Sequence, residues 1–228
     1  MVAERDSTAH SQGAPRPRRE FRREEILAAA ARLFARRGFH GVSIGDIGSA
    51  VGMSGPGIYR HFPSKEAVLS DILLGISKQL LDEGSRRVVA APDAPTALDA
   101  LLHWYVDFAL RQPDLITVQR QELSNVPEPA RRQIRRLQRL YVEEWVTVLS
   151  ELSPHAPQAR LRGAVLAMFG LLNSTPHSAS ELPAEAMAAL LYDMARAALA
   201  AAEYRADVHG RDVQFMIINM ALKLGGRR

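Results

Sequence analysis

The stretch SIGDIGSAVGMSGPGIYRHFPSK, residues 43–65, decides the fold, because it places several helix start and stop signals close together. Ser43 precedes a short apolar pattern, and Asp46 follows three residues later, which is close to a capping box with Asp in place of Glu. Gly52 can end that helix in a left-handed conformation. The spacing therefore predicts a short helix that stops at a sharp turn.

A second short helix is predicted directly after this turn, over residues 54–62. Ser54 is a candidate N-cap, and Pro56 falls in the first turn, where a missing N–H costs nothing. Ile58 and Phe62 supply an apolar side that is expected to pack in the core. The Pro-Ser pair that follows, residues 63–64, ends this helix and caps the next.

Helical patterns flank these two short helices. In REEILAAAARLFARRG, residues 23–38, apolar residues recur at helical intervals up to a stop at Gly38. A long fourth helix is expected from Ser64 to about Gly84. A long helix, a short helix, a tight turn and a second short helix form the helix-turn-helix arrangement.

The rest of the chain is also predicted to be helical. Further helices are expected at 94–113, with a stop at Pro113, and at 128–152, 157–173 and 183–204; residues 212–224 are ambiguous but favour helix. Strand signals are nearly absent. We therefore expect an all-α fold with an N-terminal helix-turn-helix domain and a larger C-terminal helical domain.

Composition limits the class of protein. The chain has 228 residues and no cysteine, so a disulfide framework and thiolate chemistry are excluded. Its apolar runs are too short to span a membrane, and the polar start lacks the apolar segment of a signal peptide. These features predict a soluble cytoplasmic protein with no membrane partner.

Positive charge is concentrated at the N-terminus. Residues 1–65 contain 11 Lys and Arg against 6 Asp and Glu, whereas the remainder contains 18 against 19. This asymmetry favours an anionic partner such as nucleic acid, although a basic disordered tail without a partner is the alternative. The run RPRREFRR, residues 16–23, is interpreted either as a flexible arm along DNA phosphates or as a solvated tail.

The motifs of an enzyme are missing. No Gly-rich phosphate loop follows a predicted strand, and no local nucleophile signature occurs. The seven His residues are scattered without the close spacing of metal ligands. We therefore expect no catalytic activity, no cofactor and no metal.

Residues 23–73 resemble the TetR family of transcriptional repressors. The resemblance rests on Leu33-Phe34, Gly38-Phe39, the segment 43–47, Val51-Gly52 and IYRHFPSKEAVL at 58–69. It implies a helix-turn-helix DNA-binding domain over 19–66, preceded by a disordered basic arm over 1–18. Residues 67–228 would form a ligand-binding and dimerisation domain, where the match is one of architecture only.

The resemblance implies that residues 54–62 enter the major groove of a double-stranded DNA operator. Two glycines in this helix let the backbone approach DNA but cannot read bases, since base readout needs side chains. A small-molecule sensor or scaffold that has lost specific DNA binding is therefore the alternative function. The expected DNA-binding residues are Ser43, Ser54, Gly55, Pro56, Gly57, Tyr59, Arg60, His61, Lys65, Arg22 and Arg23.

One such unit reads few base pairs, so a homodimer is expected to read a pseudo-palindrome. The apolar helices 157–173 and 183–204 are suited to a four-helix interface between subunits. The alternative for these apolar stripes is a core within the subunit. The expected interface residues are Leu161, Val165, Met168, Leu172, Met187, Leu190, Leu191, Met194 and Ala198.

In the family, a small molecule binds between the middle helices and disfavours the DNA-bound conformation, so the protein is expected to be a ligand-released repressor. The middle helices are rich in Leu, Ala and Met, which favours a small apolar effector. Fatty acyl-CoA is the first candidate and a hydrophobic drug the main competitor. The expected pocket residues, which have core packing as their alternative, are Trp104, Tyr105, Phe108, Arg120, Tyr141, Trp145, Phe169 and Asn173.

Overall fold

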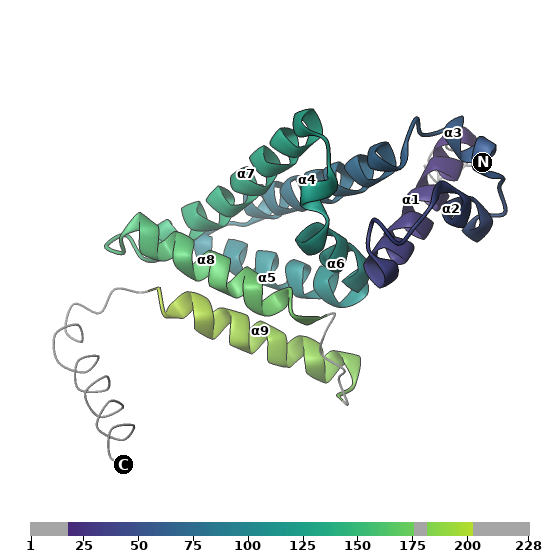
Figure 1. Ribbon diagram of the computed structural model, residues 1–228. Coiled ribbons are helices and arrows are strands. Elements are labelled where there is room, and N and C mark those ends of the chain that lie inside the picture. Colours follow the sequence, from purple (N-terminus) through teal and green to yellow (C-terminus); the bar gives the residue numbers. More distant parts are fainter. Residues whose placement is uncertain (1–17, 176–181, 203–228) are drawn as a thin grey trace, which may run out of the picture.

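The computed structural model describes residues 18–175 and 182–202, and Figure 1 shows their arrangement. The helices are α1 (Arg18–Arg37), α2 (Ile44–Ala50), α3 (Gly55–Tyr59), α4 (Lys65–Ala90), α5 (Ala94–Arg111), α6 (Pro113–Gln121), the 3-10 turn η1 (Leu123–Asn125), α7 (Glu128–Leu152), α8 (Gln158–Leu172) and α9 (Ala184–Ala200). These described residues contain no strand, so the all-α prediction is confirmed. The helix predicted at 212–224 and nearly all of the arm predicted at 1–18 lie outside the described residues.

Helices α1, α2 and α3 form a compact head at one end of the molecule (Figure 1). The capping box at α2 is present, since the Asp46 N–H donates to Ser43 Oγ at 3.1 Å and the Ser43 N–H donates to Asp46 Oδ2 at 2.8 Å. Gly52 takes a φ of +65°, the left-handed conformation that ends α2 before the turn. Ile47 of α2 and Ile58 of α3 are fully buried, and α2 packs against both α3 and α1.

Several helix boundaries differ from the sequence prediction. Helix α3 covers only 55–59, and residues 60–62 continue it as a hydrogen-bonded turn rather than as α-helix. Helix α1 begins at Arg18, so residues 18–23 of the predicted flexible arm are helical. Helix α5 ends at Arg111, close to the predicted stop at Pro113, but Pro113 also opens α6, because a proline in a first turn lacks only an N–H that would be unpaired anyway.

Helix α4 connects the head to the larger domain and is longer than expected. It passes its predicted end at Gly84 and continues to Ala90. Gly84 is buried against the Tyr141 ring of α7, so this glycine allows close helix packing instead of ending a helix. Because α4 packs against α1 in the head and along α7 in the larger domain, it belongs to the core of both.

The larger domain contains α5, α7, α8 and α9 beside α4. Helix α8 packs against α7 on one side and α9 on the other, and α9 also packs against α5. The α8 stripe expected at a dimer interface, formed by Leu161, Val165, Met168 and Leu172, is completely buried within the chain. This stripe is therefore core of the subunit, the alternative that the sequence left open.

A membrane-spanning segment needs a long, strongly apolar helix. None of the helices in the described ranges combines the necessary length and hydropathy.

Candidate DNA-reading head and effector core

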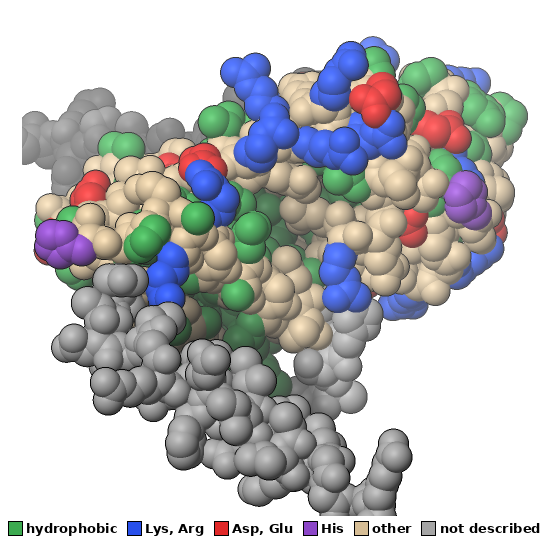
Figure 2. All heavy atoms as spheres, turned by 60° about the vertical axis from the view of Figure 1, so that its left-hand side comes forward, with side chains coloured by type: hydrophobic (Ala, Val, Ile, Leu, Met, Phe, Trp, Pro, Cys, Tyr) green, Lys and Arg blue, Asp and Glu red, His purple; other side chains and the backbone are tan. Residues whose placement is uncertain are grey.

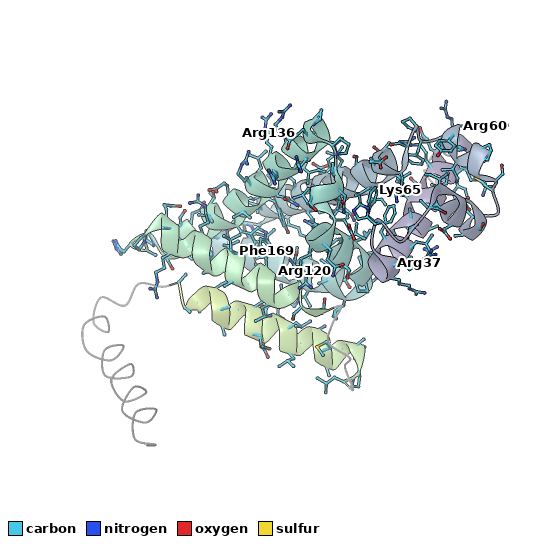
Figure 3. The ribbon with its side chains drawn as sticks, viewed as in Figure 1. Arg37, Arg60, Lys65, Arg120, Arg136 and Phe169 are labelled. Atoms are coloured by element: carbon cyan, nitrogen blue, oxygen red, sulfur yellow. The ribbon has the colours of Figure 1, made fainter. Side chains whose placement is uncertain are left out.

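The head presents a set of side chains to solvent around α3. Tyr59 is 56% exposed, and Arg60 next to it is exposed as well. Figure 3 shows Arg60 at the outer end of the head, away from the larger domain. Ser43, Ser54 and Pro56 are also exposed at the starts of α2 and α3. These five predicted contacts therefore lie where DNA can reach them.

The two glycines of α3 differ in their surroundings. A Cβ added at Gly55 would meet nothing within 4 Å, so the backbone lies open to an approaching molecule. A Cβ at Gly57 would lie 3.3 Å from Met53 Cε and 3.4 Å from Ser54 Oγ. Gly55 is thus the position at which the absent side chain leaves the most room for DNA.

Two arginines that were predicted to bind DNA form contacts within the protein. Arg23 pairs with Asp71 of α4, donates to the His61 carbonyl at 2.5 Å and lies over the Phe62 ring. Arg22 pairs with Glu25 on α1 at 2.7 Å. The Arg23 contacts join α1 to α4 and the end of the reading segment, so its guanidinium has a structural role within the head.

Lys65 also binds within the head. Its Nζ donates to the carbonyls of Phe39 at 2.9 Å and Val42 at 2.8 Å, and it lies over the Phe39 ring. These contacts hold the turn between α1 and α2 against the start of α4.

His61 is half-buried between the reading segment and α1. Burial lowers the pKa of this imidazole, and the nearby Arg19 and Arg23 lower it further. Its Nδ1 has no hydrogen-bond partner within the described part of the chain. The fold therefore favours neutral His61, although a DNA phosphate would favour the protonated form.

The head is joined to the larger domain by a carboxylate. Glu122, at the end of α6, is buried and accepts the backbone N–H of Phe39 at 3.1 Å. Its other oxygen accepts from the Asn125 amide at 2.7 Å, and Asn125 Oδ1 lies 3.1 Å from His40 Nε2. The sequence alone does not reveal this link, because only the fold brings residues 39 and 122 together, and no residue pattern around Glu122 indicates that it is buried.

Aromatic side chains meet in the middle of the larger domain. The Phe169 ring of α8 lies 4.8 Å from Tyr105, 5.6 Å from Tyr141 and 5.4 Å from Trp145, measured between ring centroids. Phe108 extends this group at 6.0 Å from Tyr105. We call these five residues the aromatic core. Helices α5, α7 and α8 thus bring together five of the eight predicted pocket residues.

Polar atoms are buried within the aromatic core. The Tyr105 hydroxyl donates to Asn173 Oδ1 at 2.8 Å, and burial raises the pKa of Tyr105. The Tyr141 hydroxyl and the Trp145 indole N–H make no hydrogen bond of good geometry within the described residues. Glu144 Oε2 lacks a partner in the same sense, and burial raises the pKa of its carboxyl group. Such groups are costly to bury unless something else satisfies them.

Two predicted pocket residues lie at the margin or outside. Trp104 is half-buried, stacks on Phe108 at 5.6 Å and receives the Arg87 guanidinium over its ring. Arg120 is exposed on α6. Asn173, by contrast, is held in the core by Tyr105.

The residues of α9 that were predicted at the dimer interface differ in their exposure to solvent. Leu191 is buried inside the subunit, and Met187 and Ala198 are half-buried. Leu190 and Met194 are exposed, as is Leu166 of the adjacent α8. The apolar surface of these two helices therefore differs from the stripe that the sequence indicated.

A metal centre needs several ligating side chains close together. Across residues 18–175 and 182–202, His, Asp and Glu do not gather in any group that would hold a metal ion.

Similar proteins were found in sequence and in structure. The transcriptional repressor KstR2 of Rhodococcus jostii is 37% identical over 81 residues, which cover 36% of this chain and 40% of that relative. A TetR-family regulator from Bordetella parapertussis has a TM-score of 0.70 and 26% identity, over 77% of this chain and 94% of that one. AibR, solved with isovaleryl coenzyme A and operator DNA, has a TM-score of 0.66 and 21% identity, over 76% and 97%.

Two family models match the chain. One describes bacterial regulatory proteins of the tetR family and matches residues 26–72, which cover α2, α3 and most of α1. The other describes the C-terminal domain of tetracyclin repressor-like proteins and matches residues 92–199. The chain therefore belongs to the TetR family of bacterial transcriptional regulators.

Proposed function

We propose that this protein is a ligand-responsive transcriptional repressor that binds a pseudo-palindromic operator as a homodimer and is released by a small apolar effector. Residues 19–66 would read DNA, and residues 67–228 would bind the effector and the second subunit. Such a repressor acts in the cytoplasm, where bacterial DNA is found.

The observation that carries this proposal is the exposed face of the head. Tyr59 and Arg60 reach solvent beside the open backbone of Gly55, while Ile58 anchors the same helix in the core. A rigid short helix with exposed aromatic and basic groups suits the major groove, where Arg can bind guanine or phosphate. The capped start of α2 supports the same surface.

The aromatic core supports an effector in the larger domain. Its rings offer apolar contact, and the Tyr141 hydroxyl and Trp145 N–H offer donors that lack good partners among the described residues. A ligand with an acceptor oxygen would satisfy these donors. Because AibR was solved with isovaleryl coenzyme A and operator DNA, we place a fatty acyl-CoA first among effectors and a hydrophobic drug second.

The test is operator binding by fluorescence anisotropy at a stated salt concentration, with DNA that flanks the protein's own gene. The double variant Tyr59→Ala/Arg60→Ala should weaken specific binding at least tenfold, since each lost base contact costs about 1–3 kcal/mol. Because both side chains are exposed, the double variant should unfold at the same midpoint as wild type. This measurement is the control that the head remains folded. Full-strength binding by this variant would show that another surface reads the operator.

A sensor without specific DNA binding is the second candidate. Gly55 and Gly57 supply no side chain for base readout, and this is the observation that favours it. In that case the wild-type protein would bind its flanking DNA no better than unrelated DNA, while an effector would still raise its melting temperature.

A further inference from the structure

The first half of α7 carries positive charge that the reading head does not use. Residues 129–142 contain five arginines and no Asp or Glu. Arg131 is half-buried and pairs with Glu128. The other four are exposed, and we call them the arginine row: Arg132, Arg135, Arg136 and Arg139. Within the described part of the chain, no ion pair neutralises any member of this row.

The arginine row is unfavourable for an isolated helix. Its members recur at intervals of three and four residues, so they lie on one face of α7. Four pairs of like charges are therefore neighbours on the helix surface, where repulsion destabilises a helix. A solvated helix face more often alternates acidic and basic residues at these spacings. An anion bound along the row would offset this repulsion.

The row faces the same side of the molecule as the reading residues. Figure 3 shows Arg136 on the upper part of α7 and Arg60 on the head, and both side chains point upward. Figure 2, turned about the vertical axis, shows Lys and Arg side chains gathered along the same upper edge. The two views together place the row and Arg60 on one side of the molecule.

The chain also keeps the start of the row near the head. Asn125 Oδ1 lies 3.1 Å from His40 Nε2, in the loop between α1 and α2. Three residue steps lead from Asn125 to the start of α7, and about one helical turn leads on to Arg132. This path is at most roughly 17 Å long. The row therefore begins beside the junction of the head and the larger domain, where a long partner can touch both.

We propose that the arginine row contacts phosphates of the same DNA duplex that the head reads, as a second contact that is independent of base sequence. The proposal rests on the proposed function. The row extends over roughly 10 Å of α7, and a duplex carries one charge per about 1.7 Å of its axis, so each guanidinium can find a phosphate. Guanidinium groups bind phosphate through paired hydrogen bonds.

A second contact of this kind complements the reading helix. Gly55 and Gly57 supply no side chains for base readout, so the head makes few contacts of its own with the bases. Phosphate contacts add affinity and fix the position of a protein on DNA without reading bases. The arginine row would therefore supply binding strength that α3 lacks.

An acidic segment of a partner protein is the other polyanion that arginines would attract. DNA is the better match, because the row lies on the same side as Arg60 and because the chain belongs to a family of DNA-binding regulators. A protein partner would leave operator binding independent of the row, so the same experiment separates the two.

The test measures operator binding by fluorescence anisotropy at several salt concentrations for two variants with the same change of net charge. Arg132→Gln/Arg136→Gln removes two charges of the row. Gln158→Glu/Ala159→Glu is the control, at exposed positions in the first turn of α8, at the opposite end of the larger domain from the head (Figure 1). Acidic residues are favourable in a first turn, so this control should fold normally.

The row variant should bind the operator about tenfold more weakly or worse at low salt. The slope of log Kd against log salt should become shallower by about 0.9 for each lost phosphate contact, or about 2 for each subunit. Affinity for unrelated DNA should fall by the same factor, so the ratio of specific to unrelated affinity should stay constant. The control should change little, and the melting temperature of the free row variant should not fall, because repulsion within α7 is reduced.

A second variant, Arg135→Gln/Arg139→Gln, should give the same shallower slope. If neither row variant changes the slope, the proposal is wrong and the row serves another anion, such as an acidic protein segment. Equal losses in a row variant and in the control would show that overall charge, and not the row, attracts DNA. A lower ratio of specific to unrelated affinity would contradict a contact that is independent of base sequence.

The proposed function can fail separately from this proposal. If the wild-type protein binds its flanking DNA no better than unrelated DNA, the repressor function is wrong, but a shallower slope of the row variants on unrelated DNA would still support the second contact. Specific operator binding that depends on Tyr59 and Arg60 but not on the arginine row would contradict only the second contact.

Discussion

At the scale of the residue, Asp46 shows how one carboxylate stabilises the reading head. Its pKa falls from 3.8 to about 2, chiefly because the Ser43 hydroxyl and backbone N–H donate to it, with a smaller effect of Arg37. A lowered pKa favours the folded state above pH 4, and this contribution is lost as the pH falls from about 4 to about 2.

The variant Asp46→Asn keeps the shape of the cap but removes this ionisation. We expect it to be less stable than wild type at neutral pH, and the difference should shrink as the pH approaches 2. Urea unfolding followed by circular dichroism across this range measures the difference. If it stays constant with pH, the charge of Asp46 does not stabilise α2.

At the scale of the element, the contact between α4 and α7 depends on a missing side chain. A Cβ at Gly84 would lie 2.7 Å from Tyr141 Cε2, so the variant Gly84→Ala must displace that ring. Overpacking of this kind costs about 1–3 kcal/mol, against a gain in helix propensity of about 1 kcal/mol. We expect a lower melting temperature and, because Tyr141 belongs to the aromatic core, weaker effector binding.

Gly75 provides a matched control in the same helix. A Cβ there would meet nothing within 4 Å, so Gly75→Ala should gain propensity without a clash and raise the melting temperature slightly. Equal shifts in both glycine variants would contradict the packing role of Gly84.

These elements also show the reach of sequence reasoning. The capping signals of Ser43, Ser54 and Gly52 are local, so they predicted the starts of α2 and α3 and the stop of α2 correctly, whereas α3 ends at Tyr59, earlier than predicted. Gly84 also looked like a helix stop, but its role depends on Tyr141 across the contact between α4 and α7. Pro113 predicted the end of α5 but gave no sign that α6 begins at the same residue. A local sequence pattern cannot indicate contacts with residues that lie far away in the sequence.

At the scale of the whole molecule, the apolar surface of α8 and α9 offers a place for a second subunit. Leu166 is 53% exposed and Met194 is 45% exposed, on two adjacent helices. The variant Leu166→Glu/Met194→Glu should convert a dimer to a monomer, because charges at a buried interface are not solvated. Sedimentation equilibrium measures the mass, and Val89→Glu, at a position 85% exposed at the end of α4, serves as the control.

Operator affinity should fall together with the dimer. Two linked heads gain from an effective concentration that a monomer lacks, so the loss should exceed that of any single contact on one head. A double variant that remains a dimer would place the interface elsewhere.

The candidate site residues could also be predicted only where local helical spacing was enough. Helical spacing was enough to bring Tyr105, Tyr141, Trp145 and Phe169 near one another, because apolar rings on facing helices turn inward. Spacing could not separate the interior from an interface, so the α8 stripe at Leu161 and Met168 was assigned outward. It also gave no sign that Arg23 and Lys65 are engaged within the head, since their partners come from distant segments.

The bond between Glu122 and the Phe39 amide has a practical consequence for anyone who builds hybrid regulators. Transplanting a foreign DNA-reading head onto this larger domain would keep α4 intact but place a different α1–α2 loop against the buried Glu122 side chain. Unless the new loop offers a backbone N–H at the position of Phe39, Glu122 Oε1 would lose this hydrogen bond while remaining buried. Chimeras joined at residue 65 should therefore fold poorly or lose communication, and compatibility should follow the α1–α2 loop rather than overall similarity of the modules.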